Sequence, residues 1–167
     1  MESKFIRIPI LDQAAAEIKQ SDSFEQTLKK PEVETIMTTV INGALRRKKE
    51  KVTANVTSMN VDIENNQGHV QATAAVEKPI TGDIGINLTL ENTSRPGQLG
   101  TKNLEITAPA IAKGKIQKAA EDALKNPNQA LFTELYEQLQ LRGVSLTGIS
   151  LNFKDNALSI NLQGNEI

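Results

Sequence analysis

A strict alternation of apolar and polar residues is the feature that most constrains how this chain can fold. It is clearest at Ile84, Ile86, Leu88 and Leu90, which are separated by polar residues and glycine. Successive side chains of a strand point to opposite faces, so this segment predicts a strand with one aliphatic and one solvated face. Similar runs, separated by turn residues, fill the stretch 52–107 and predict an antiparallel meander.

The first two strands of this meander carry further detail. The parity of their apolar residues changes near residues 57–58, which predicts a bulge or a bend. Residues 65–68, Asn-Asn-Gln-Gly, read as a turn. A turn of that length would place Ile63 opposite Val70 on the apolar face.

The end of the chain predicts a separate hairpin around Asp155 and Asn156. Both residue types tolerate the positive φ that a two-residue hairpin turn requires. Such a turn would place apolar residues of the two strands opposite one another, in the pairs Phe153–Leu158, Leu151–Ile160 and Ile149–Leu162. A second change of parity at Gly148 predicts another bulge.

Helical spacing dominates the two remaining regions. In residues 1–50, a short helix is expected from Asp12, and Phe24 and Leu28 follow as an i, i+4 pair. The most amphipathic segment is 31–47, which predicts a helix long enough to cross several strands. Residues 108–142 predict two further helices separated by a break at 126–128.

These patterns predict a single α+β domain over residues 1–167. It should contain an antiparallel meander sheet of about six or seven strands, with helices packed mainly on one face. The expected regions are a helical N-terminal part (1–50), the β-meander (51–107), a second helical part (108–142) and a C-terminal hairpin (143–164).

The composition removes several classes of function. The chain has 19 Lys plus Arg and 20 Asp plus Glu, so its charge favours neither nucleic acid nor an acidic partner. There is no cysteine and one histidine, His69, which leaves no usual zinc site and no cysteine nucleophile. We find no catalytic motif, and we therefore expect a protein that is not an enzyme and uses no cofactor or metal.

Two groups of residues remain as candidates for binding. The first is an aliphatic surface between the meander and the long helix, nearly free of aromatic rings, as an acyl chain would prefer. Its candidate lining is Ile36, Met37, Val40, Ile41, Ile84, Ile86, Leu88 and Leu90. The second is a basic run at the end of the long helix, a candidate for contact with an anionic membrane surface. It consists of Arg46, Arg47, Lys48 and Lys49.

Each group also has a simpler interpretation. Helices usually cover an apolar sheet face, so the first group could form an ordinary filled core. Cations at the C-terminal end of a helix complement its dipole, so the second could be a solvated helix end. The residues alone leave both alternatives open.

The order of elements resembles the LmeA-like phospholipid-binding family, which is grouped near the tubular lipid-binding (TULIP) proteins. The local similarity is strongest over 110–163, from the helices that hold Asn128 to Phe132 to the final hairpin. The resemblance implies a lipid-binding, membrane-associated domain of an exported protein, and it carries over no site residue. As the sequence stands we expect a cytoplasmic protein, or a protein of the cell envelope if a leader was removed.

The resulting hypothesis is non-enzymatic binding of lipid or another apolar ligand between the sheet face and the amphipathic helix, at or near a membrane. The alternative is a structural or protein-interaction module with a filled core and no ligand.

Overall fold

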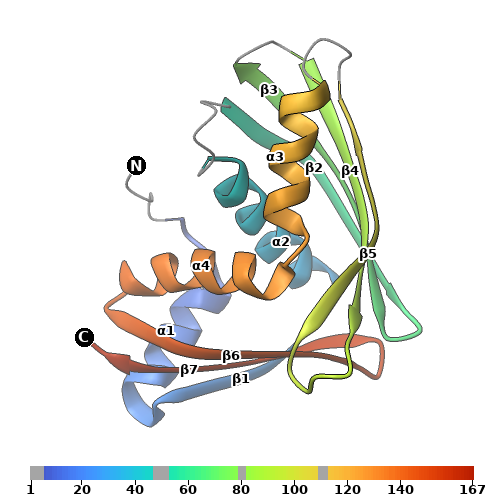
Figure 1. The fold of residues 1–167 in the computed structure, drawn as a ribbon. Coiled ribbons are helices and arrows are strands. Elements are labelled where there is room, and N and C mark those ends of the chain that lie inside the picture. Colours follow the sequence, from blue (N-terminus) through green and yellow to red (C-terminus); the bar gives the residue numbers. More distant parts are fainter. Residues whose placement is uncertain (1–5, 47–52, 79–81, 109–112) are drawn as a thin grey trace.

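The computed structural model describes residues 6–46, 53–78, 82–108 and 113–167, and within them it contains four helices and seven strands. The strands form two antiparallel sheets, with the orders β2-β3-β4-β5 and β1-β7-β6 (Figure 1). The elements are α1 (Pro9–Ser21), β1 (Ser23–Leu28), α2 (Lys30–Arg46), β2 (Thr53–Glu64), β3 (Gln67–Lys78), β4 (Gly82–Asn92), β5 (Leu99–Thr107), α3 (Lys113–Leu124), α4 (Pro127–Gln140), β6 (Val144–Lys154) and β7 (Ala157–Glu166). The predicted α+β class, strand number and antiparallel pairing are confirmed.

The four-stranded sheet is the predicted meander, in which each strand pairs with the next along the chain. The expected bulge is present as a register shift between Val56 and Ser58. The predicted pairing of Ile63 with Val70 is wrong by two residues, because Val61 lies opposite Val70. The turn is shorter than predicted: residues 65 and 66 alone make it, both with positive φ.

The three-stranded sheet joins the two ends of the described chain. Its β6–β7 hairpin has the predicted turn, with φ of 54° at Asp155 and 56° at Asn156. All three predicted cross-strand pairs are present, and the register shift lies next to Gly148 as expected. The third strand is β1, which pairs antiparallel with β7.

The strand β1 corrects the prediction for the segment before α2. Phe24 and Leu28 are four residues apart, which suits one face of a helix and also one face of a strand. The structure places both side chains on the buried face of β1, with exposed fractions of 2% and 0%. Helix α1 also begins earlier than expected, at Pro9, because proline suits the first turn of a helix.

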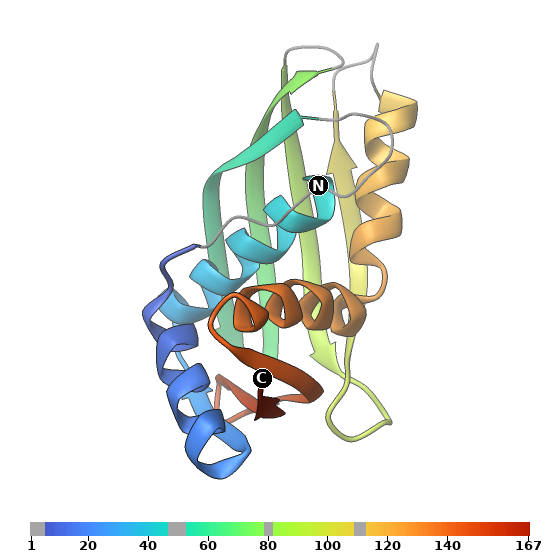
Figure 2. The same cartoon turned by 90° about the vertical axis from the view of Figure 1, so that its left-hand side faces the viewer.

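The helices cover the inner faces of both sheets (Figures 1 and 2). Helix α2 packs chiefly on β2, and α3 packs on β5 at the opposite edge of the same sheet. Helices α1 and α4 pack on the three-stranded sheet, and α4 also contacts α2 and β5. The buried apolar side chains of both sheets and all four helices form one continuous core.

Asparagine side chains bind the two sheets to each other. The amide of Asn92, at the end of β4, donates to the carbonyl of Phe153 on β6 (2.9 Å) and accepts from the Phe153 N–H (2.8 Å). Asn66 and Asn156, in the two hairpin turns, each accept the backbone N–H of the other, at 3.2 and 3.1 Å. The Phe153 ring lies so close to Gly68 that a Cβ there would be 2.9 Å from its Cζ. The sheets therefore meet along their hairpin ends.

Candidate functional site

The candidate apolar lining belongs to the buried core. Its eight side chains are between 0% and 4% exposed, and all belong to the same hydrophobic cluster. Ile84, Ile86, Leu88 and Leu90 come from β4, and the other four come from α2. The structure thus places the four residues of β4 and the four residues of α2 in one buried core. So little of their surface is open that protein atoms, and not a free cavity, cover them in this state.

The inner face of the four-stranded sheet combines large and small side chains. Ala72 and Ala74 on β3 lie opposite Ile86 and Ile84 on β4. Both alanines are buried, with exposed fractions of 5% and 0%. Small side chains let a covering helix approach the sheet closely.

The basic run lies at the limit of what the structure describes. Arg46 is the last residue of α2, and its side chain is outside the described set, as are residues 47–49. The proposed contact of these four cations with a membrane therefore stays a prediction. Within the described parts of the chain, no helix is long and apolar enough to span a membrane.

The edge of β2 carries the ion pair with the clearest electrostatic effect. Lys30 Nζ lies 2.8 Å from Asp62 Oδ1 and donates to Asn60 Oδ1 at 2.7 Å. The hydrogen bond from Lys30 lowers the pKa of Asp62, and a second bond from the Asn60 amide lowers it further. The hydrogen bond to Asp62 raises the pKa of Lys30. The side chains of Lys30 and Asp62 are 47% and 61% exposed, so the pair lies on a solvated surface.

His69 takes part in ordinary surface contacts. Its Nδ1 lies 3.1 Å from Thr89 Oγ1, and its Nε2 is 3.8 Å from a carboxylate oxygen of Glu64. Among the residues that the structure describes, no group of three His, Cys, Asp or Glu side chains could hold a metal ion.

Buried polar groups near the end of α4 and in the turn after it hold the N-terminal segment in place. The Arg142 guanidinium donates to Asp12 Oδ1 at 2.8 Å and to the carbonyl of Ile6. The side-chain oxygen of Gln138 accepts the Ile6 N–H at 3.1 Å. These contacts tie residues 6–12 to the end of α4.

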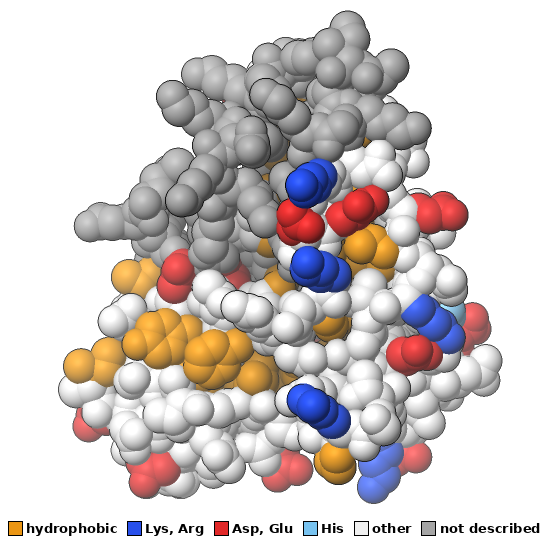
Figure 3. All heavy atoms as spheres, in the orientation of Figure 1, with side chains coloured by type: hydrophobic (Ala, Val, Ile, Leu, Met, Phe, Trp, Pro, Cys, Tyr) orange, Lys and Arg blue, Asp and Glu red, His pale blue; other side chains and the backbone are white. Residues whose placement is uncertain are grey.

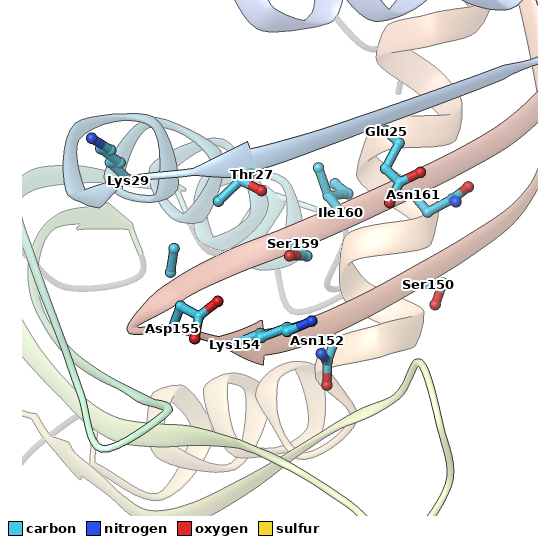
Figure 4. Close-up of a pocket in the computed structure, with 11 residues that line it drawn as sticks. Glu25, Thr27, Lys29, Ser150, Asn152, Lys154, Asp155, Ser159, Ile160 and Asn161 are labelled. Atoms are coloured by element: carbon cyan, nitrogen blue, oxygen red, sulfur yellow. The ribbon is translucent and has the colours of Figure 1, made fainter.

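A polar hollow of about 630 Å³ lies on the outer face of the three-stranded sheet (Figure 4). Its lining is Glu25, Thr27, Lys29, Ser150, Asn152, Lys154, Asp155, Ala157, Ser159, Ile160 and Asn161. The two lysines balance the two carboxylates, and the remaining lining is mostly hydroxyl and amide groups. This surface suits hydrogen bonding to a polar molecule and offers little to an acyl chain. No sequence motif identifies this hollow, although the polar alternation at residues 150, 152 and 154 predicts a solvated face.

The surface of α4 is the most apolar part of the face seen in Figure 3, where hydrophobic side chains form a band over that helix. Phe132 and Tyr136 are half-buried there, with ring centroids 6.0 Å apart. Leu141, directly after α4, is 46% exposed. Half-buried side chains of this kind are common on protein surfaces, and they do not by themselves identify a site.

Comparison with known proteins gives little further information. No family model matches the sequence, and no curated protein matches it significantly. Among solved structures, the chain is similar to the crystal structure of lipopolysaccharide binding protein, with 10% identity and a TM-score of 0.29. The alignment covers 86% of this chain and 40% of that one, so the chain spans well under half the length of that protein. A likeness at this level carries no argument about fold or function, and the resemblance to LmeA-like proteins stays a prediction.

Proposed function

We propose that this protein binds an acyl chain or a similar apolar ligand between the inner face of β2–β5 and the helices α2 and α3, without catalysing a reaction. One observation carries the proposal: a continuous aliphatic sheet face is covered by two helices that pack on opposite edges of that sheet. A ligand that entered between them would meet β3 and β4 in the middle of the sheet.

Binding would require the helices to move, because the lining side chains are covered in this state. Each methylene of an acyl chain gains about 0.8 kcal/mol when it leaves water. A chain of ordinary length could therefore offset the loss of several side-chain contacts between helix and sheet. Ala72 and Ala74 are the positions where the ligand would gain most space.

The basic run 46–49 begins at the last residue of α2 and would place one of the moving helices at an anionic membrane surface. In this proposal the run attracts the protein to the bilayer, and the aliphatic face receives the ligand. The attraction should weaken at high salt, because screening shortens the range of these interactions.

Labelling with a photoreactive fatty acid tests the proposed site directly. After irradiation and proteolysis, the label should appear in peptides of β3, β4 and α2. Native mass spectrometry of the purified protein should also show a bound mass that organic extraction removes. Label confined to the outer faces of the sheets, together with no bound mass, would refute the proposal.

Liposome sedimentation tests the membrane contact separately. Reversing Arg47 and Lys48 to glutamate should reduce binding to anionic vesicles at low salt and leave binding to neutral vesicles unchanged. The matched control reverses Lys118 and Lys125, two exposed lysines on and just after α3. If both double variants lose the same amount of binding, the basic run has no special role.

The second candidate is an interaction module with a filled core, favoured by the 0% to 4% exposure of the eight lining residues. Under this alternative, no fatty acid labels the inner face, and the protein acts through its surface.

A further inference from the structure

Three of the sheet edges are protected by polar groups that take the place of a neighbouring strand. On β2, the N–H of Val56 donates to Asn42 Oδ1 (2.7 Å), and the N–H of Val61 donates to Glu34 Oε2 (2.9 Å). On β6, Asn92 pairs with Phe153 in both directions. At the start of β5, the Asn128 amide makes the same two-way pair with Leu99, at 2.8 and 2.7 Å. Natural proteins manage exposed edges in such ways.

The edge of β1 has no such protection among the described residues. This strand pairs with β7 on one side, and within the described ranges no side chain or backbone group is hydrogen-bonded to its other side. Ser23, Glu25 and Thr27 are all exposed. The outer edge of β1 is therefore available to another strand.

The hairpin turn identifies which backbone groups point to this open edge. Because Lys154 and Ala157 close a two-residue turn, the odd-numbered residues of β7 bond to β6 and the even-numbered ones to β1. The bond from the Gly164 N–H to the Asp22 carbonyl, at 3.1 Å, agrees with this alternation. The even residues of β1 therefore face β7, and the N–H and C=O of Ser23, Glu25 and Thr27 face outward.

We propose that this edge pairs with the same edge of a second copy of the chain, antiparallel about a two-fold axis at Gln26. Glu25 of each copy would lie opposite Thr27 of the other, and these pairs would exchange their free N–H and C=O groups. The two sheets would merge in the order β6-β7-β1-β1-β7-β6. This inference is independent of the proposed ligand.

Charge and backbone bonding select this register over its neighbours. An axis at Glu25 would place two carboxylates directly opposite each other, which is destabilising. An axis at Thr27 would require the backbone of Lys29 to join the ladder. That backbone is already engaged, because its N–H donates to Glu32 Oε1 (3.3 Å) and its carbonyl accepts from Val33 (3.0 Å). Pairing about Gln26 avoids the opposed carboxylates, and its two Glu25–Thr27 pairs form without Lys29, which would lie opposite Ser23 where the ladder ends.

The same register is consistent on both faces of the merged sheet. Phe24 and Leu28, the buried side chains of β1, would lie opposite each other on the inner face. On the outer face, Lys29 of one copy would lie diagonal to Glu25 of the other. Glu25, Thr27 and Lys29 also line the polar hollow (Figure 4), so the hollows of the two copies would adjoin.

The interface is small, since β1 has six residues. Stable complexes usually bury roughly 1,200–2,000 Å² in total, more than one short strand from each copy provides. We therefore expect reversible association that becomes visible at high protein concentration. Sedimentation velocity across the micromolar to millimolar range should show a shift from monomer to dimer.

Charge exchange across the axis tests the register. Thr27→Glu would oppose carboxylates in both symmetry-related pairs and should weaken dimerisation roughly fivefold. Combining it with Glu25→Lys restores opposite charges in both pairs and should return the dimer to at least wild-type affinity. The control Asn152→Glu adds a charge to an exposed site on β6, away from the edge, and should leave association unchanged. Thermal unfolding of each variant verifies that it is folded.

Amide hydrogen exchange measures directly whether the outward-facing amides of β1 become protected when the protein dimerises. The amides of Glu25 and Thr27 should exchange more slowly as protein concentration rises, whereas those of Gln26 and Leu28 should not change. A wild-type protein that stays monomeric at millimolar concentration overturns the proposal. Equal weakening by Thr27→Glu and Asn152→Glu, or failure of Glu25→Lys to restore association, overturns the register.

Discussion

The two sheets use the same local devices but are completed from different parts of the chain. Each contains a hairpin closed by two residues at positive φ, 65–66 in one and 155–156 in the other. Each hairpin also has a register shift that bends it. The four-stranded sheet then adds strands that follow directly, whereas the three-stranded sheet takes β1 from near the other end of the chain. Local pattern thus determines the hairpins, and tertiary packing determines what joins them.

The largest loss of stability is expected from substitutions in the cores of the two sheets, which can be compared directly. Leu88→Ala on β4 and Leu151→Ala on β6 each remove a side chain that is no more than 4% exposed. If both cores are filled, each substitution should cost about 2–5 kcal/mol in urea unfolding. A loss well below that range for Leu88 alone would indicate that the four-stranded sheet yields space for a ligand. Equal losses would favour the interaction module.

The contact between the sheets gives the next largest effect. Gly68→Ala would place a Cβ 2.9 Å from the Phe153 ring, so the ring or the strand must shift. We expect a loss of about 1–3 kcal/mol in the free energy of unfolding, the range for overpacking. Gly85→Ala on β4 is the matched control, because its Cβ would meet a neighbour at an ordinary 3.7 Å. Similar losses for the two variants would contradict the close contact between the sheets.

Replacing Asn92, which links β4 to β6, should lower the free energy of unfolding by as much as Gly68→Ala does, or by less. Asn92→Ala removes two hydrogen bonds and leaves the polar groups of Phe153 without these partners. The expected loss is about 1–3 kcal/mol, with faster hydrogen exchange of the Phe153 amide. Exchange that is unchanged at Phe153 would show that water replaces the amide without cost.

The smallest effect concerns the exposed Lys30–Asp62 pair. The pKa of Asp62 is lowered in the folded state, so its ionised carboxylate stabilises the fold at pH values above its unfolded pKa. This stabilisation is lost as the pH falls through the pKa of the folded state. The pKa of Lys30 is raised in the folded state, so its ammonium group stabilises the fold at pH values below its unfolded pKa. That stabilisation is lost as the pH rises through the pKa of the folded state. The Lys30–Asp62 pair should therefore stabilise the fold between about pH 4 and about pH 10. Asp62→Asn should lower the melting temperature slightly at neutral pH and not at all near pH 2. An equal decrease at both pH values would assign the effect to something other than charge.

Much of the fold could be predicted from alternation and turn chemistry. The register of β6–β7 was predicted correctly because Asp155 and Asn156 leave one reasonable turn. The register of β2–β3 was missed because Asn65, Asn66 and the residues after them allow turns of different lengths. The strand β1 was missed because its two buried residues, Phe24 and Leu28, fit either periodicity.

The candidate sites were less predictable than the fold. The apolar lining was brought together because aliphatic periodicity directly reflects burial. The partner of Asn92 could not be predicted, since an asparagine side chain in sequence gives no indication of which distant backbone it will bond. The open edge of β1 could not be found either, because an edge is defined only once every other strand has its place.

The pairing of Ser23 with Gln163 also fixes an order of events during synthesis. The ribosome releases β2 to β5 one after another, so the meander can assemble while the chain is still being made. β1 emerges before all of them and must wait for β7, nearly the last segment to appear. Until then the backbone of β1 lacks the antiparallel partner that β7 finally provides. A nascent chain stalled before β7 should therefore already protect the amides of β3 and β4 while leaving the amides of β1 open to exchange.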